Sequence, residues 1–132
     1  MSAYVAAIET DREAMLARWR DWSAQGAATS LFQTPAWLAA WYATLGAQPG
    51  RQPLLASVAR PDGRVLMALP LSLERRGGLR RIGFADLGVA DYAAPLLMPD
   101  CPTDAAGVRA MVDSLRRVLP QADLLAIEKM PE

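Results

Sequence analysis

The sequence contains no histidine and a single cysteine, Cys101. Histidine is the side chain that most often serves as a general base or a metal ligand near neutral pH, so both kinds of chemistry lack their commonest residue here. One cysteine cannot form an intramolecular disulfide, and without a Cys/His cluster there is no zinc-ligand pattern. We therefore predict a reducing compartment, the cytoplasm, and no metal site.

Net charge and long apolar runs are lacking as well. Fourteen basic and fourteen acidic residues cancel, which removes any general electrostatic attraction to nucleic acid or to an anionic membrane. No apolar run approaches the ~20 residues of a membrane span. The N-terminal stretch has no basic region and meets acidic residues by Glu9. We expect neither signal peptide nor membrane insertion, and no nucleic-acid partner.

The composition that remains is typical of one soluble domain spanning residues 1–132. The chain is 52% hydrophobic and 21% charged, and it is long enough to bury a core. Its first half predicts a strand and two helices. Ala3–Ile8 has the β-branched and aromatic residues of a strand, and the capping-box pattern Thr10-Asp11-Arg12-Glu13 predicts a helix start at Thr10.

Tryptophans at helical spacing mark the buried faces of these two helices. In the first helix Trp19 and Trp22 follow Met15 and Leu16, and Gly26 is the expected end. The second helix starts at Thr34-Pro35 and runs to about Leu45, with Trp37 and Trp41 on one face and Gly46 closing it in the left-handed conformation. Ligand stacking is the alternative, but large aromatics at this spacing mostly fill interiors.

After a loop at Ala47–Pro53, the spacing of hydrophobic residues becomes that of β-strands. Leu54–Ala59 and Val65–Leu73 flank the turn Pro61-Asp62-Gly63, and Pro70 should mark a bulge or an edge position. The turn Arg76-Gly77-Gly78 leads into Leu79–Ala85, which predicts a three-stranded antiparallel meander. Four arginines flank that turn: Arg75, Arg76, Arg80 and Arg81. These arginines could bind an anionic ligand. We favour the alternative, in which they are solvated at the hairpin end and Glu74 partly compensates their positive charge.

The stretch Ile82–Met98, IGFADLGVADYAAPLLM, supplies the candidate site. It begins as a strand, breaks at Gly88, and presents Asp91 and Tyr92 before an apolar run. A polar pair at a strand end is a common way to present side chains to a substrate, so we take both as candidate substrate-binding residues. In the structural alternative, Asp91 caps the turn and Tyr92 packs its ring with the hydroxyl at the surface.

The remaining chain predicts a helix and a final strand. Thr103 or Asp104 should cap a helix that ends before Pro120 and carries the following stripe: Val108, Met111, Val112, Leu115 and Leu119. Ala122–Ile127 is a continuous apolar run of the kind expected for a buried parallel strand after a helical crossover. The predicted fold class is α/β (α+β), with the order β-α-α-β-β-β-β-α-β or the same with one strand fewer.

Four segments in order resemble the N-terminal domain of the CelD-like family of bacterial acyltransferases. They are FQTPAWLAAWYATLG (Phe32–Gly46), PDGRVLMALPLSLERRGGLRRIGF (Pro61–Phe84), GVADYAAPLLMP (Gly88–Pro99) and LLAIEKMPE (Leu124–Glu132), so that coverage runs from about residue 30 onward. The element order is similar to the first part of the GNAT acyltransferase fold. The resemblance implies a mixed GNAT-like sheet, transfer from acyl-CoA to an amine or hydroxyl, a role in cellulose or exopolysaccharide biosynthesis, and tandem GNAT domains in full-length members.

One departure from the GNAT pattern predicts that this chain does not catalyse by itself. Where an active GNAT domain has a basic or glutamine residue and closely spaced glycines to hold the acyl-CoA pyrophosphate, the chain reads PDCPTDAAG (Pro99–Gly107). Prolines remove N–H donors, and Asp100 and Asp104 repel phosphate. We therefore expect a truncated GNAT domain that binds no cofactor of its own and whose partner is a C-terminal acyltransferase domain.

The sequence does not decide which residues would be catalytic. With histidine absent, the candidate bases are Asp91, Glu74 and Glu128, with Tyr92 as acid; Cys101 is a weaker nucleophile because its loop has no basic neighbour. The alternative to an acyltransferase domain is a protein-interaction module without enzymatic activity, which pairs with itself or another chain through exposed apolar surface.

Overall fold

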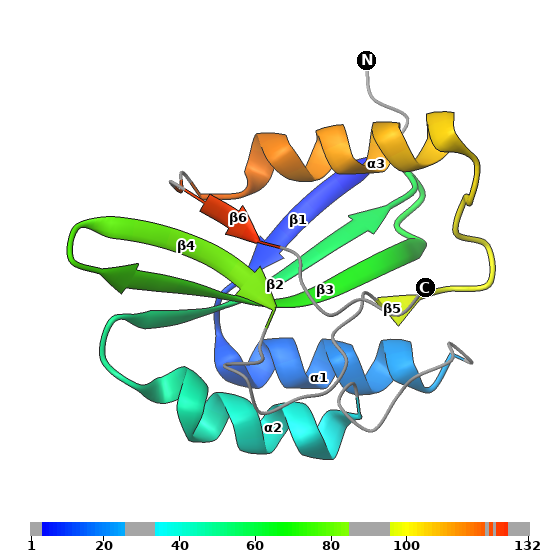
Figure 1. Ribbon diagram of the computed structural model, residues 1–132. Coiled ribbons are helices and arrows are strands. Elements are labelled where there is room, and N and C mark those ends of the chain that lie inside the picture. The colour runs from blue at the N-terminus through cyan, green and yellow to red at the C-terminus, as the bar shows by residue number, and fades with distance from the viewer. Residues whose placement is uncertain (1–3, 26–33, 85–95, 121, 123, 127–132) are drawn as a thin grey trace.

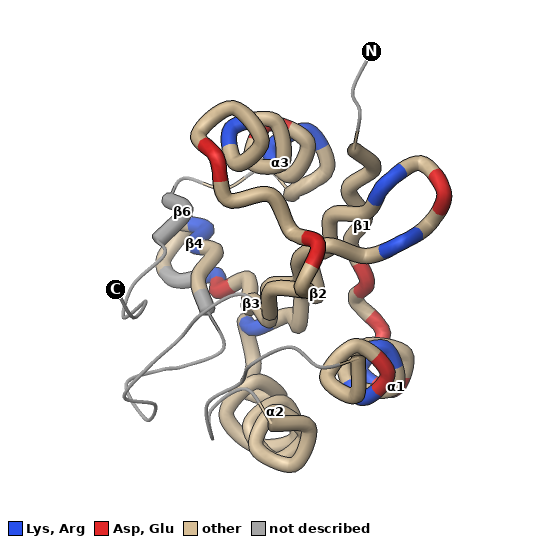
Figure 2. The backbone as a smooth tube through the Cα atoms, turned by 90° about the vertical axis from the view of Figure 1, so that its right-hand side faces the viewer, with Lys and Arg blue, Asp and Glu red and all other residues tan. Residues whose placement is uncertain are grey.

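The computed structural model describes residues 4–25, 34–84, 96–120, 122 and 124–126. Within these residues, a mixed sheet lies between helices (Figure 1). Helices α1 (Arg12–Ser23) and α2 (Pro35–Ala43) cover one face, and α3 (Ala105–Val118) covers the other. Figure 2 shows the same three layers after a quarter turn. The predicted mixture of helices and strands is confirmed.

The sheet has six strands in the described part of the chain: β1 (Val5–Glu9), β2 (Arg51–Ala59), β3 (Val65–Arg76), β4 (Leu79–Phe84), β5 (Leu96–Leu97) and β6 (Leu124–Ala126). The order is β1-β2-β3-β4-β6, and β5 pairs with β3. Every pairing is antiparallel except that of β4 with β6, which is parallel. The predicted element order and the parallel last strand are therefore confirmed.

Of the two positions predicted for Pro70, a bulge or an edge, the structure shows the edge-like one. It lies opposite Leu55 in regular register, and the irregularity between β2 and β3 falls at Val58/Ala59 instead. On its other side, β3 pairs with β4 up to Leu71 and with β5 from Ala68. Pro70 thus falls between two pairings, where a missing N–H donor costs no ladder hydrogen bond on that side.

Both predicted turns of the meander are present. The Gly63 φ of 93° closes the turn between β2 and β3, and the Asp62 carboxylate accepts a hydrogen bond from the Arg64 N–H at 3.0 Å. Gly77 (φ 56°) and Gly78 (φ 85°) form the two-residue turn between β3 and β4. Positive φ at both positions is the requirement of the tight hairpin turn whose twist matches the strands.

The N-terminus of α1 differs from the predicted capping box. Asp11, not Thr10, is the N-cap, and its carboxylate accepts from the Ala14 N–H at 2.9 Å. Glu13 does not reach back, because the Glu9 carboxylate already accepts from the Thr10 and Asp11 N–H groups. The helix therefore starts one residue later than the pattern indicated.

In α2 the predicted start is confirmed and the predicted end is wrong. The Thr34 hydroxyl accepts from the Trp37 N–H at 3.3 Å, with Pro35 in the first turn. The helix ends at Ala43 and passes into a 3₁₀ turn, η2 (Leu45–Ala47). Gly46 does not have positive φ; it is buried, and a Cβ there would lie 2.6 Å from the Trp41 ring. Close packing, not a left-handed closure, explains this glycine. The predicted loop is also shorter, since β2 begins at Arg51.

Successive side chains of each strand point to opposite faces of the sheet, so the core forms two clusters. One lies between the sheet and α3, and its buried members include Leu54, Val58, Leu71, Ile82, Met111 and Leu115. The other lies between the sheet and α1 and α2, and includes Met15, Trp19, Trp22, Leu38, Trp41, Leu55 and Leu96. The predicted interior role of the α1 tryptophans and of Trp41 is confirmed, while Trp37 is only half-buried.

Tyr42 connects α2 to the centre of the sheet. Its buried hydroxyl donates a hydrogen bond to the Leu71 carbonyl at 2.8 Å, and its ring meets that of Trp41 edge-on with centroids 5.2 Å apart. Complete burial raises the pKa of the Tyr42 hydroxyl far above its ordinary value, because a phenolate there would lose its hydration. This residue therefore has a structural role.

Candidate functional site

Asp91 and Tyr92, the predicted substrate-binding pair, lie outside the described residues, as does Glu128. The strands on either side of them are described. β4 ends at Phe84 opposite Leu71, and β5 begins at Leu96 opposite Ala68. These two strands pair with consecutive parts of the same side of β3. Residues 85–95 therefore connect two neighbouring points on the β3 edge.

The Asp104 carboxylate caps the N-terminus of α3. Asp104, one of the two predicted caps, accepts a hydrogen bond from the Gly107 N–H at 3.0 Å. A Cβ on Gly107 would lie 2.7 Å from the Pro102 Cβ and 2.9 Å from an Asp104 oxygen. Helix N-termini attract anions through free N–H groups, but here an aspartate occupies that place. The geometry therefore disfavours a phosphate at this helix end.

Cys101 is half-buried at the edge of α3. Its thiol contacts the Pro102 carbonyl at 3.7 Å and the Met111 sulfur at 4.0 Å. Burial raises the pKa of the thiol above its ordinary value. Because the thiolate is the reactive form, this environment disfavours Cys101 as a nucleophile, in line with its low rank in the sequence.

Glu74, the one candidate base that the structure describes, takes part in an ion pair. Its carboxylate lies 3.4 Å from the Arg51 guanidinium, and both side chains are mostly buried. In the register of the hairpin, Glu74 also lies opposite Arg81, and Arg75 lies opposite Arg80. Glu74 thus compensates positive charge at this end of the sheet, as predicted, and its carboxylate is engaged by Arg51.

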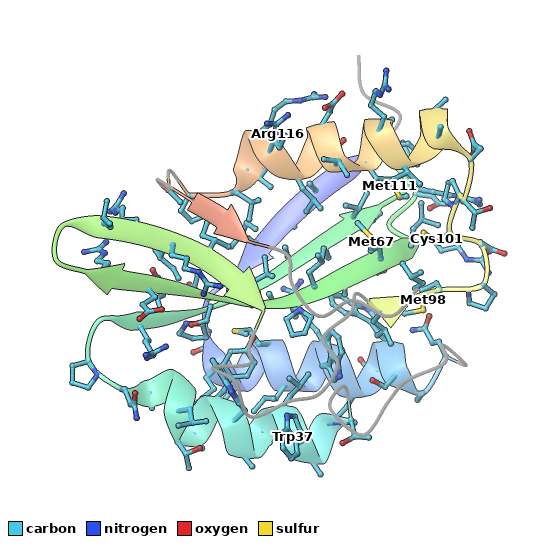
Figure 3. The ribbon with its side chains drawn as sticks, viewed as in Figure 1. Trp37, Met67, Met98, Cys101, Met111 and Arg116 are labelled. Carbon is cyan, nitrogen blue, oxygen red and sulfur yellow. The ribbon has the colours of Figure 1, made fainter. Side chains whose placement is uncertain are left out.

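A cavity lies between α3 and the sheet, and we call it the α3 pocket. Its volume is about 580 Å³. The sheet contributes Ala56, Met67, Leu69, Leu71 and Leu97. The loop before α3 contributes Cys101, Pro102 and Thr103, and the helix region contributes Val108, Met111, Val112, Leu115 and Leu119. Figure 3 shows Met67, Cys101 and Met111 facing one another across this space.

The position of α3 explains why this space is open. The helix packs mainly over β1 and β2, so the side that it turns toward β3 and β5 is only partly covered. Met111 and Leu115 are buried, whereas Val108 and Val112, predicted as core, are 41% and 43% exposed. The predicted apolar stripe of α3 is therefore real. All five of its residues line the pocket, but only Met111 and Leu115 are also buried in the core.

Other features of the described residues are weaker candidates. A hollow of about 240 Å³ lies beside α2, lined by Trp37, Trp41 and their neighbours. No group of three metal-ligating side chains occurs among residues 4–25, 34–84, 96–120, 122 and 124–126. In that part of the chain, no helix has the length and apolar character to cross a membrane.

Comparison of the chain with protein-family models, with curated proteins and with solved structures finds no match.

The α3 pocket was not predicted from the sequence. Helical spacing identified Val108, Met111 and Val112 as one apolar face, but it cannot tell which of them meets a neighbouring element. Met67, Cys101 and Met111 belong to three different segments, so their residue types alone did not indicate a shared pocket.

Proposed function

We propose that the chain is a non-catalytic, substrate-side domain of a GNAT-type acyltransferase of the CelD-like kind. The observation that carries the proposal is the sheet arrangement. An antiparallel β1–β4 sheet is followed by the α3 crossover and by β6, which pairs in parallel with β4. Together with the four sequence segments that resemble CelD-like proteins, this arrangement supports the GNAT assignment. The reaction class is acyl transfer from CoA to an amine or hydroxyl, with a polysaccharide pathway as its setting and the cytoplasm as its location.

The α3 N-terminus supports the non-catalytic half of the proposal. Acyl-CoA recognition at a helix N-terminus needs backbone N–H groups directed at the pyrophosphate. Asp104 accepts from Gly107 at that place, and Pro102 lacks an N–H altogether. In the proposed arrangement a C-terminal acyltransferase domain supplies the cofactor site, and Asp91 and Tyr92 orient the acceptor.

Acyl transfer by the chain alone tests this proposal. We would mix the protein with acetyl-CoA and a set of amine and hydroxyl acceptors, and measure acetylated product by mass spectrometry. The expected result is no product above the protein-free rate. Enzyme-dependent product that disappears in Asp91→Asn or Tyr92→Phe, while both variants unfold like the parent, would show instead that the chain carries a complete active site.

The α3 pocket favours a second candidate function, an interaction module that pairs with itself or another chain. Leu97, Val108 and Val112 are exposed apolar residues around one opening. Sedimentation velocity over a wide concentration range separates the candidates. A concentration-dependent dimer would favour the interaction module, and a monomer at all concentrations would rule out self-pairing.

A further inference from the structure

The walls of the α3 pocket restrict the chemistry of its occupant. Its volume of about 580 Å³ falls within the about 300–1,000 Å³ typical of small-molecule sites. None of the lining residues is charged, and Thr103 is the one lining residue with a hydroxyl. We propose that the α3 pocket binds a single unbranched, uncharged alkyl chain. This proposal does not rest on the acyltransferase assignment.

An apolar chain fits these walls better than a polar ligand. A buried polar group must find a hydrogen-bond partner, and the pocket offers few. The Cys101 thiol already contacts the Pro102 carbonyl and the Met111 sulfur. Met67 and Met111 face the space from opposite layers, and their unbranched side chains adapt to occupants of different length.

The charges near the pocket argue against an anionic head group. The loop that contributes Thr103 also carries Asp100 and Asp104. Asp100 forms an ion pair with Arg64 at 2.9 Å, which leaves that arginine engaged. The Asp104 carboxylate holds the helix N-terminus through Gly107. A fatty-acid carboxylate at this end would meet acidic side chains, so we expect a neutral chain to bind more tightly than its carboxylate analogue.

By itself, the exposed rim is smaller than one side of a stable protein interface. A stable interface takes roughly 800 Å² from each partner. Among the residues that the structure describes, the exposed apolar side chains around the pocket are Leu97, Val108 and Val112, which are 46%, 41% and 43% exposed. Three half-exposed side chains cover a small part of that area, whereas they suffice to frame the entrance for one chain.

The test uses primary alkanols from hexanol to dodecanol as probes. Cys101 lines the pocket and is the single cysteine of the chain, so a bound alkanol should slow its reaction with a thiol reagent. We expect the half-protecting concentration, and the Kd from calorimetry, to fall about fourfold for each added methylene until the chain fills the pocket. Dodecanoate should bind more weakly than dodecanol.

Two variants on α3 form a matched pair. Val112 lines the pocket and is 43% exposed; Val118 is on the same helix, 40% exposed, and does not line it. Val112→Asp should weaken dodecanol binding at least tenfold, and Val118→Asp should leave it unchanged. Because both sites are exposed, both variants should fold. Met67→Trp fills the pocket from the sheet side and should also abolish binding.

Three results would overturn the proposal. The first is a Kd that does not change with chain length, which would indicate non-specific adsorption. The second is equal binding by the Val112→Asp and Val118→Asp proteins. The third is a stable dimer that Val112→Asp dissociates and dodecanol does not, since the entrance would then be a protein interface.

Discussion

At the residue scale, side chains with short-range spacing signals were predicted well and those with competing partners were not. Trp19, Trp22 and Trp41 are buried as their helical spacing indicated. The Thr10 capping box failed because the neighbouring Glu9 carboxylate accepts from the Thr10 N–H, and Asp11 caps the helix instead. Tyr42 gave no signal in the sequence, since its bond to Leu71 joins residues 29 positions apart.

Replacing Trp41 should be costly. It is 3% exposed within the cluster between the sheet and the α1–α2 layer, so Trp41→Ala should lower the free energy of unfolding by about 3–5 kcal/mol. Trp37→Ala, on the same helix but half-buried, is the control and should cost less. Urea unfolding measures both. Equal costs for the two variants would show that the Trp41 packing is misread.

Tyr42→Phe should lower the free energy of unfolding by about 1–3 kcal/mol at neutral pH, because the Leu71 carbonyl loses a buried donor. The variant should also change the alkaline response. The pKa of Tyr42 is raised in the folded state, so the unfolded state loses its proton first as the pH rises above about 10.

The Tyr42 hydroxyl thus stabilises the fold fully below about pH 10, and this contribution declines by about 1.4 kcal/mol per pH unit above it. Urea midpoints of the parent and Tyr42→Phe proteins between pH 8 and 11 give the difference. If the urea midpoints of the two proteins changed in parallel with pH, a buried and protonated Tyr42 hydroxyl would be contradicted.

At the element scale, the order of helices and strands was predictable because hydrophobic period and turn residues are local. The glycines of the two hairpin turns, Gly63 and Gly77-Gly78, and the start signal Thr34-Pro35 lie where the patterns placed them. For Pro70 the sequence left a bulge and an edge position open, because the outcome depends on where β4 and β5 stop along β3, which the tertiary structure decides. The choice between Thr103 and Asp104 as cap was likewise left open by the sequence and is decided by the bond to Gly107.

The cap of α3 can be tested at Asp104, with the neighbouring Thr103 as a control. Asp104→Ala should lower the free energy of unfolding by about 1 kcal/mol, because the Gly107 N–H loses its acceptor, and Asp104→Asn should cost less. Thr103→Ala, one residue earlier and exposed, should be neutral. Thermal or urea unfolding reports all three. A larger loss in Thr103→Ala than in Asp104→Ala would contradict the observed cap.

At the scale of the whole molecule, two features bear on function: the α3 pocket and the N-terminus of α3. α3 lies over β1 and β2, which leaves the pocket open toward β3 and β5, and its N-terminus is held by Asp104. The cap was one of two alternatives that the sequence predicted. The pocket was not predicted, because it depends on where the helix lies over the sheet. Arg116 lies on the outer side of α3, away from the pocket (Figure 3).

The central claim is that this chain is a GNAT-type domain without its own acyl-CoA site, and calorimetric titration with acetyl-CoA tests it most directly. The two-carbon acyl group is too short to fill the α3 pocket, so saturable binding would report recognition of the CoA moiety. The account predicts no saturable heat, because Asp104 occupies the helix N-terminus that a phosphate needs. A Kd in the low micromolar range, about −8 kcal/mol, would contradict it.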